Sequence, residues 1–283
     1  MKKRAVFFGA SIIVVIILIV FGILSWIPQT TTNQTVNGFQ WRMSRWSGTI
    51  TIVGDTYIAP WISLTIEPGT MVRFEKEADF PGTDWEGNAD AYIKDHDDPT
   101  GRVDYKKTHY RLYGKIIAKG TATEPIIFTS AQTEPEYADW DELILRSKSQ
   151  LDYVELAYAH NGINIAGSDV VVQRSTIHDS LWSCVDIFSV NNVIENNTIY
   201  HCWHQAIGTK VIGKNTIQQN TIHDANLSVN CEYNSNPSVR ENHIEAAPLD
   251  PNCNAENQNT IIDRAFDTPG GTYNRTLIYP ATR

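Results

Sequence analysis

The segment VQRSTI at residues 172–177 returns three times in varied form, as IENNTI (194–199), IQQNTI (217–222) and VRENHI (239–244). Each copy has a branched apolar residue, two polar residues, Ser or Asn, one variable residue and a final isoleucine. These isoleucines, at positions 177, 199, 222 and 244, are 22, 23 and 22 residues apart. Short β-branched runs separated by Asn and Gly are typical of strands rather than helices. The fixed step therefore predicts a solenoid with about 22 residues in each coil.

A second apolar column keeps the same step. Its members are 22 residues apart: Ile163, Val185, Ile207 and Val229. Parallel coils stack about 4.8 Å apart, so residues one period apart lie above one another, and inward columns must be apolar. One further column consists of Ser175, Asn197, Asn220 and Asn242. We interpret these asparagines as a structural ladder of stacked side-chain amides.

The N-terminal half alternates strand-like runs with Pro-Gly and Lys-Gly turns, as in LTIEPGTMVRF (64–74), GKIIAKGTATEPIIFTSA (114–131) and ADWDELIL (138–145). With the Asn-rich repeats, these segments resemble right-handed parallel β-helix proteins of the pectin-lyase-like superfamily on bacterial and archaeal cell surfaces. The resemblance covers roughly residues 46–244. It implies an all-β fold, a right-handed parallel β-helix. It does not single out an activity, because the superfamily includes lyases, glycoside hydrolases, epimerases and adhesins.

Residues 5–27 form an uncharged, mostly apolar run of 23 residues. As a helix this run would reach about 34 Å, enough for a hydrocarbon core of about 30 Å. The alternative is a cleaved signal peptide, which normally has a shorter apolar stretch and a small-x-small cleavage site, whereas this run ends in LSWIPQT. We therefore expect a single-pass membrane protein. Because Lys2, Lys3 and Arg4 precede the run, the N-terminus is expected in the cytoplasm and the domain outside the cell.

The expected organisation has five parts: a basic tip (1–4), a transmembrane signal anchor (5–27), a polar stalk (28–36), the β-helix (37–265) and a C-terminal tail (266–283). Without Lys2, Lys3 and Arg4, 20 basic residues face 32 acidic ones, a formal charge of −12. A surface this acidic repels phosphate backbones, so we expect no nucleic-acid partner.

An acidic insertion is expected at residues 76–109, where the sequence is too polar for a coil. Within DHDDPTG, the side chains of Asp95, Asp97 and Asp98 have oxygen atoms of the kind that Ca2+ prefers. The spacing does not complete an EF-hand loop, and a solvated loop is the alternative. A transition-metal site formed by His178, His201, His204 and His223 is a further alternative, although only His201 and His204 are spaced as a ligand pair on one element.

The four cysteines include no CxxC pair, which argues against zinc and thioredoxin-like chemistry and leaves three possible disulfide connectivities. Cys231 and Cys253 are 22 residues apart, one coil, so we predict that they pair. Cys184 and Cys202, 18 apart, are then expected to form the second disulfide.

Stacking also predicts a candidate site. One outward column is expected to contain Glu155, His178, Tyr200, His223 and Glu245, and the next Asp179, His201 and Asp224. The candidate catalytic residues are accordingly His178, Asp179, Tyr200, His201, His223 and Asp224. A third column with an adjoining tryptophan is expected to bind substrate and consists of His160, Trp182, His204 and Trp203.

The sequence leaves two functions open. The first is a surface domain that binds glycans or neighbouring surface proteins. The second is a polysaccharide lyase, epimerase or glycoside hydrolase. Asp179 and Asp224, two coils apart, are expected at about 9.6 Å, and two carboxyl groups about 6.5–9.5 Å apart suit an inverting hydrolase. Outward positions are polar in any β-helix, so the columns by themselves do not decide whether the protein is an enzyme.

Overall fold

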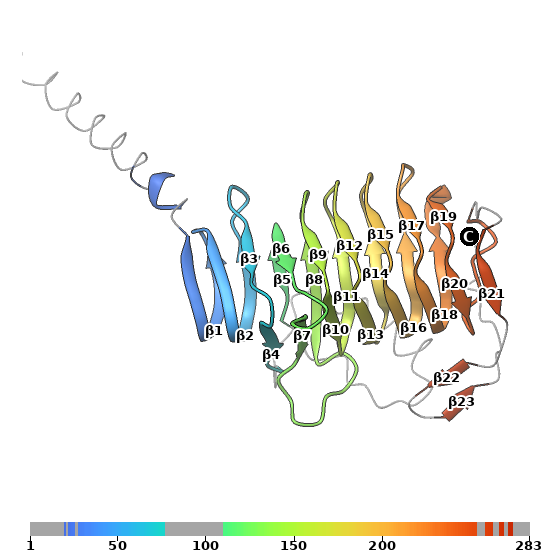
Figure 1. Ribbon diagram of the computed structural model, residues 1–283, viewed down its shortest axis with the longest axis horizontal. Coiled ribbons are helices and arrows are strands. Elements are labelled where there is room, and N and C mark those ends of the chain that lie inside the picture. The colour runs from blue at the N-terminus through green and yellow to red at the C-terminus, as the bar shows by residue number, and fades with distance from the viewer. Residues whose placement is uncertain are drawn as a thin grey trace, which may run out of the picture.

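The computed structural model describes residues 20, 22–25, 28–76, 110–253, 258–262, 266–268 and 271–273. They form an elongated stack of parallel strands with β1 at one end and β21 at the other (Figure 1). Three columns of strands, here called faces 1, 2 and 3, surround one main apolar core. Each coil passes through face 3, face 1 and face 2 in that order, which is the arrangement of a parallel β-helix.

Face 1 consists of β4 (Met71–Phe74), β7 (Ile126–Ser130), β10 (Val154–Ala157), β13 (Thr176–Ser180), the first halves of β16 (Thr198–Thr209) and β18 (Thr221–Cys231), β20 (His243–Glu245) and β21 (Thr260–Ile262). Face 2 consists of β5 (Leu112–Gly114), β8 (Trp140–Leu145), β11 (Ala159–Ile165), β14 (Ser183–Ile187) and the second halves of β16 and β18. Face 3 consists of β3 (Leu64–Ile66), β6 (Ile116–Lys119), β9 (Gln150–Asp152), β12 (Val171–Gln173), β15 (Val193–Glu195), β17 (Thr216–Gln218) and β19 (Ser238–Arg240). A 3-10 turn, η1 (Glu232–Asn234), follows β18.

The first two strands, β1 (Gln29–Gln40) and β2 (Ser44–Ile58), each run through all three faces, since β2 pairs in turn with β3, β4 and β5. Residues 28–36 were expected to form a polar stalk. In the structure most of them belong to β1, which pairs in parallel with β2. Its threonines are β-branched and suit a strand. Val36 is buried, so this polar segment forms the first coil.

The strand register confirms the period predicted from the repeats. Face 3 aligns Val172, Ile194, Ile217 and Val239; face 1 aligns Ile177, Ile199, Ile222 and Ile244; and face 2 aligns Ile163, Val185, Ile207 and Val229. All twelve side chains are buried. Stacked apolar columns therefore make the core.

The amide ladder is also confirmed. The Nδ2 atoms of Asn197 and Asn220 donate to Oδ1 of the next asparagine, each at 3.0 Å, and the ladder extends through Asn242 to Asn259. It follows a corner where Asn196 and its equivalents in neighbouring coils have left-handed φ. The same Oδ1 atoms accept backbone N–H groups of the preceding coil, so the ladder satisfies backbone groups at the bend.

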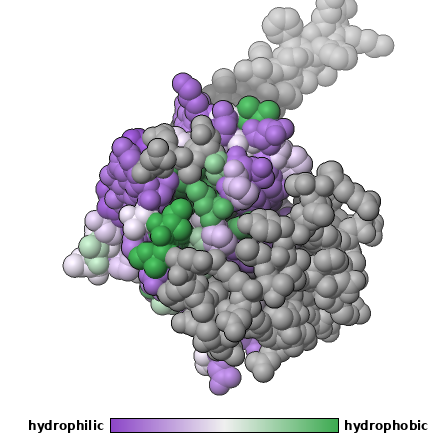
Figure 2. Space-filling view, turned by 90° about the vertical axis from the view of Figure 1, so that its right-hand side faces the viewer, coloured by the Kyte–Doolittle hydropathy of each residue, from purple (hydrophilic) through white to green (hydrophobic). Residues whose placement is uncertain are grey.

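At the C-terminal end, the described residues of the expected tail form an antiparallel pair, β22 (Phe266–Thr268) and β23 (Gly271–Tyr273). Apolar residues are visible among hydrophilic ones on this end of the molecule (Figure 2). Ile261 and Ile262 of β21 are 53% and 42% exposed. The last strand of the stack, β21, therefore has exposed apolar side chains.

The predicted anchor (5–27) lies mostly outside the described residues. The parts of it that are described, residues 20 and 22–25, are helical. Over the described ranges, no helix has both the length and the apolar character needed to cross a membrane.

Candidate functional site

The predicted site residues gather at the corner between faces 1 and 2. Asp179, His201 and Asp224 occupy this corner in successive coils, each with φ of 51°. Left-handed φ is uncommon for residues other than glycine, and Asp and His are among the types that adopt it more often. Because the same bend recurs in each coil, residues from neighbouring coils come together there.

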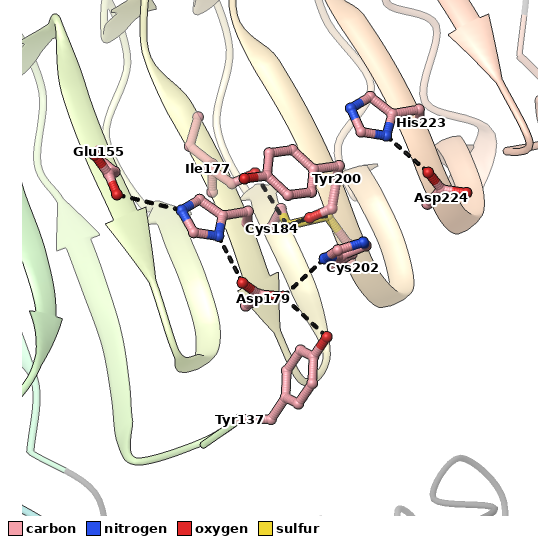
Figure 3. A network of polar contacts seen from close by, with 11 residues as sticks. Tyr137, Glu155, Ile177, Asp179, Cys184, Tyr200, Cys202, His223 and Asp224 are labelled. Carbon is pink, nitrogen blue, oxygen red and sulfur yellow. Dashed lines mark hydrogen bonds and ion pairs between the residues drawn. A yellow bond between two sulfur atoms is a disulfide. The ribbon is translucent and has the colours of Figure 1, made fainter. Parts of the chain in front are cut away.

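Asp179 is the centre of the polar contacts at this corner (Figure 3). Its Oδ2 lies 2.7 Å from Nδ1 of His178, and its Oδ1 lies 2.9 Å from Nδ1 of His201. Oδ1 also accepts a hydrogen bond from the Tyr137 hydroxyl at 3.0 Å. On the other side of the imidazole, Nε2 of His178 lies 3.6 Å from Oε1 of Glu155. Tyr137 comes from the loop between β7 and β8, outside the repeats, and no sequence pattern pointed to it.

These contacts set the protonation states. Burial raises the pKa of Asp179, but the contacts with His178 and His201 outweigh burial and hold that pKa far below its ordinary range. Burial lowers the pKa of His178, but Asp179 and Glu155 outweigh it and raise that pKa to about 9. The contact with His178 in turn lowers the pKa of Glu155. At neutral pH, His178 is therefore a cation between two carboxylates.

A row of stacked rings on face 1 borders this network. The His178 ring stacks on the Tyr200 ring with centroids 4.9 Å apart, and Tyr200 stacks on His223 at 4.8 Å. Burial, followed by Asp179, raises the pKa of Tyr200, so its phenol keeps its proton. Because the ring faces contact one another, groups outside the row can reach these rings only at their edges. His223 also forms a second His–Asp pair, with Nδ1 2.9 Å from Oδ2 of Asp224.

One predicted column member is displaced. The sequence places Glu155 in the column of His178, but the register pairs Ala157 with His178 and Glu155 with Thr176. The step between Ala157 and His178 is 21 residues, so this coil is shorter than the spacing of 23 used for Glu155. Glu155 therefore reaches His178 diagonally.

The column expected to bind substrate lies on the other side of the corner, where face 2 begins. The N–H groups of Trp182 and His204 donate to the carbonyls of His160 and Trp182, at 2.8 and 2.9 Å, so these three residues are aligned. The rings of Trp182 and His204 stack at 4.1 Å. Trp203 packs edge-on against Tyr137 at 6.3 Å and so joins this column to the Asp179 network.

Face 2 also carries a polar cluster that the sequence analysis missed. Asp186 is 1% exposed, and its carboxylate accepts a hydrogen bond from Nε2 of Gln205 at 2.8 Å and lies 3.3 Å from Nζ of Lys210. At Gly208, the next coil's equivalent of Asp186, an added Cβ would overlap the Gln205 and Asp186 side chains. Asp186 follows Val185 of the apolar column by one residue, as Asn164 follows Ile163, so the same step of 22 residues predicts this alignment.

The groups of face 2 titrate differently from those at the corner. Burial raises the pKa of Asp186. Burial, followed by the charge of Asp141, raises the pKa of Glu142 to about 7, and Asn164 donates a hydrogen bond to this carboxyl group at 2.9 Å. Burial, followed by the charge of Lys210, lowers the pKa of His204 to about 4. Face 2 therefore holds a carboxyl group that titrates near neutrality and a neutral imidazole.

Both predicted disulfides are confirmed. Cys231 pairs with Cys253, and Cys184 pairs with Cys202, with Cα atoms 5.2 and 5.6 Å apart. The second bridge joins β14 to β16 beside the corner and holds neighbouring coils together there.

The predicted Ca2+ residues Asp95, Asp97 and Asp98 lie outside the described residues. Among those that the structure describes, no group of three or more potential His, Cys, Asp or Glu metal ligands occurs.

The comparison with family models agrees with this architecture. Residues 143–264 match the model described as a right handed beta helix region. The match and the three parallel faces define the chain as a right-handed parallel β-helix protein. More closely, the match and the parallel strands support the pectin-lyase-like type of this fold. No curated protein matches the chain.

Proposed function

We propose that this protein is a single-pass, membrane-anchored surface protein whose β-helix binds an extended glycan along the corner between faces 1 and 2. The observation that carries the proposal is the row of His178, Tyr200 and His223, whose polar ring edges repeat once per coil. The stacked Trp182 and His204 lie across the corner. Hydrogen-bonding groups beside flat apolar rings suit sugars, which have hydroxyl groups and apolar ring faces.

The spacing of the row favours a polymer over a single sugar. The ring centroids of the row are 4.9 and 4.8 Å apart, close to the length of one residue in an extended β-linked glycan. A straight chain along the axis can thus offer one sugar to each coil. Strands that are paired on both sides hold the row in place, so binding requires little ordering of the protein.

The charges at the corner favour binding over proton transfer. A general base needs a free lone pair near neutral pH. His178 is already protonated, with a pKa of about 9, and the carboxylate of Asp179 already contacts two imidazoles and a phenol. His178 and Asp179 are therefore better suited to act as a fixed hydrogen-bond donor and acceptor than to exchange protons.

Glycan cleavage is the second candidate function, and one observation favours it. Glu142 has a pKa of about 7, which suits a general acid at neutral pH. Its neighbour Asp141 lies 3.4 Å from Nδ1 of His160, at the start of the proposed binding column.

The anchor is proposed from the sequence and from the residues next to it. Ile23 and Leu24, which lie in the helical stretch, are 60% and 36% exposed. An exposed apolar helix after a basic tip suits insertion into a bilayer with the domain outside. Protease added to intact cells is expected to digest the domain, and complete protection would exclude this topology.

Binding is tested with the full-length protein in lipid nanodiscs and a panel of neutral and acidic polysaccharides. Tyr200→Ala is expected to weaken binding about tenfold, a loss of about 1.4 kcal/mol. Tyr233→Ala is the matched control, because Tyr233 is 73% exposed on η1, away from the corner, and its loss is expected to leave binding unchanged.

The same samples distinguish binding from cleavage. If the protein binds the polysaccharide without cleaving it, neither new reducing ends nor unsaturated products are expected. Equal affinity of wild type and Tyr200→Ala for every polysaccharide bound would refute the proposed row. Products that disappear in Glu142→Gln would instead establish an enzyme.

A further inference from the structure

We propose that the first two coils carry an aromatic collar that rests on the headgroup layer of a lipid bilayer. The collar consists of Phe39, Trp41, Arg42 and Trp61. The inference rests on the proposed membrane anchor and goes beyond it, because it assigns a lipid contact to the β-helix domain itself. It also states which end of the solenoid faces the membrane.

Backbone hydrogen bonds tie the collar to the end of the anchor. The N–H of Met43 donates to the carbonyl of Ser25 at 2.9 Å, and the N–H of Gln29 donates to the carbonyl of Met43 at 2.7 Å. Ser25 belongs to the last turn of the predicted anchor (5–27). Trp41 and Arg42 directly precede Met43, so they lie on a turn bonded to that end.

The collar extends to the next turn of the chain. The N–H of Ala59 donates to the carbonyl of Gln40 at 2.9 Å, which brings the turn after β2 next to the turn after β1. On that turn, Trp61 meets Phe39 edge-on with ring centroids 6.1 Å apart. Phe39 is 57% exposed and Trp61 is 45% exposed. Paired, exposed aromatic rings beside a transmembrane segment match the aromatic belts of membrane interfaces.

The charge of Arg42 and the backbone of β1 determine how deep in the bilayer the collar can lie. The guanidinium of Arg42 lies 4.2 Å from the centroid of the Trp41 ring, which combines an aromatic surface with a cation that anionic headgroups attract. β1 is the first coil, and one of its edges faces away from the stack (Figure 1). Among the described strands β1 pairs only with β2, so the N–H and C=O groups of its other edge need water or headgroups as partners, since hydrocarbon offers none. The headgroup layer is therefore the depth at which the collar fits.

This arrangement determines where the glycan row stands. Tyr200 lies six coils beyond β1, so the row would be held about 29 Å from the collar along the solenoid axis, at about 4.8 Å per coil. The corner is then presented beyond the headgroups to polymers at the cell surface.

The test uses the full-length protein in vesicles of phosphatidylcholine and phosphatidylglycerol that contain a lipid with a nitroxide on its headgroup. Trp41→Phe with Trp61→Phe keeps the aromatic rings but removes their emission. This double variant is expected to lose most of the headgroup-quenched fluorescence that remains in a Trp26→Phe background. Trp182→Phe with Trp203→Phe is the control, which removes two tryptophans far from the collar and is expected to leave the quenching unchanged.

The outcomes separate the collar from the anchor. Trp26 belongs to the predicted anchor, so quenching that is lost in Trp26→Phe alone reports insertion of that segment. If Trp26 is quenched but Trp41→Phe with Trp61→Phe changes nothing further, the collar proposal is wrong and the anchor stands. If Trp26 is not quenched, the anchor proposal fails. Cross-linking of the collar to a second copy of the chain, without lipid quenching, would also overturn the lipid contact.

Discussion

Replacing Asp179 with Asn removes one charge from the corner network and little else. Asn is close to Asp in size and also tolerates left-handed φ, which is 51° here. Its side-chain oxygen can still accept a hydrogen bond from the Tyr137 hydroxyl, but a neutral amide no longer balances the positive charge of the protonated His178. The substitution therefore isolates the electrostatic contribution of the carboxylate.

The magnitude follows from the pKa of His178. The change from 6.5 to about 9 corresponds to about 3 kcal/mol at about 1.4 kcal/mol per pKa unit. The side chains of His178 and Asp179 are 12% and 16% exposed, so solvent screens this interaction only in part. Asp179 makes the shorter of the two contacts, 2.7 Å against 3.6 Å for Glu155, and so contributes the larger share. We expect Asp179→Asn to lower the free energy of unfolding at neutral pH by about 2 kcal/mol.

The pH dependence has a definite sign. The pKa of His178 is higher in the folded state, about 9 against 6.5, so its stabilising contribution is complete below pH 6.5 and is lost as the pH rises through 9. Asp179 and Glu155 have lowered pKa values, so their contribution is lost as the solution becomes acidic. The wild type should therefore lose stability on the alkaline side, and Asp179→Asn should show a weaker dependence there.

Urea unfolding over a series of pH values measures this loss, and NMR titration of the His178 ring measures its pKa. In Asp179→Asn that pKa should fall by about one unit or more. Asp169→Asn is the matched control, since Asp169 is an exposed corner residue with φ of 61°, and its stability should change by less than about 0.5 kcal/mol. An unchanged His178 titration together with an unchanged unfolding midpoint would refute the reasoning.

Three further predictions concern the scaffold. Asn220→Ala removes a buried amide that bonds to both neighbouring coils. The free energy of unfolding in urea should fall by about 3 kcal/mol or more, because buried polar groups lose their partners. A loss below about 1 kcal/mol would contradict a stabilising role of the ladder. Gly208→Ala should cost about 1–3 kcal/mol, because the methyl group overlaps the Gln205 side chain, and a melting temperature equal to that of the wild type would show that this side chain moves away freely. Cys231→Ser should lower stability by about 3 kcal/mol, since the lost bridge to Cys253 closes a loop of 22 residues; reducing agent should lower the wild type toward the variant, and no effect of reduction would contradict this.

Much of the fold could be predicted from the repeats, because a solenoid converts sequence period directly into spatial neighbours. The step from Ile177 to Ile199 identified an inward column, and the step from Cys231 to Cys253 identified a disulfide. The same reasoning succeeded for the Asn ladder, where one period brings one amide to the next. The irregular N-terminal half has no such step, so its sequence does not reveal that the polar segment of β1 forms a coil rather than a stalk.

The candidate site was predicted only in part, since a shared column does not determine contact. The alignment of His178, Tyr200 and His223 follows from the period, and their rings do stack. Glu155 was placed in the wrong column because one coil is shorter, although its side chain still reaches His178. The buried charge of Asp186 on face 2 is not evident from the repeats, because the aligned residues Asn164 and Gly208 in the neighbouring coils carry no charge.

The sequence by itself determined the strand period, the inward columns, the ladder and the cysteine pairs, because each depends only on the number of residues in a coil. The tertiary structure alone decided how Asp179 is used. Its left-handed φ aims the carboxylate at two imidazoles from successive coils, and a loop outside the repeats adds the Tyr137 hydroxyl. The protonation of His178 and Glu142 was likewise settled only in the folded chain, because a pKa depends on burial and on charges brought close by folding rather than on the order of residues.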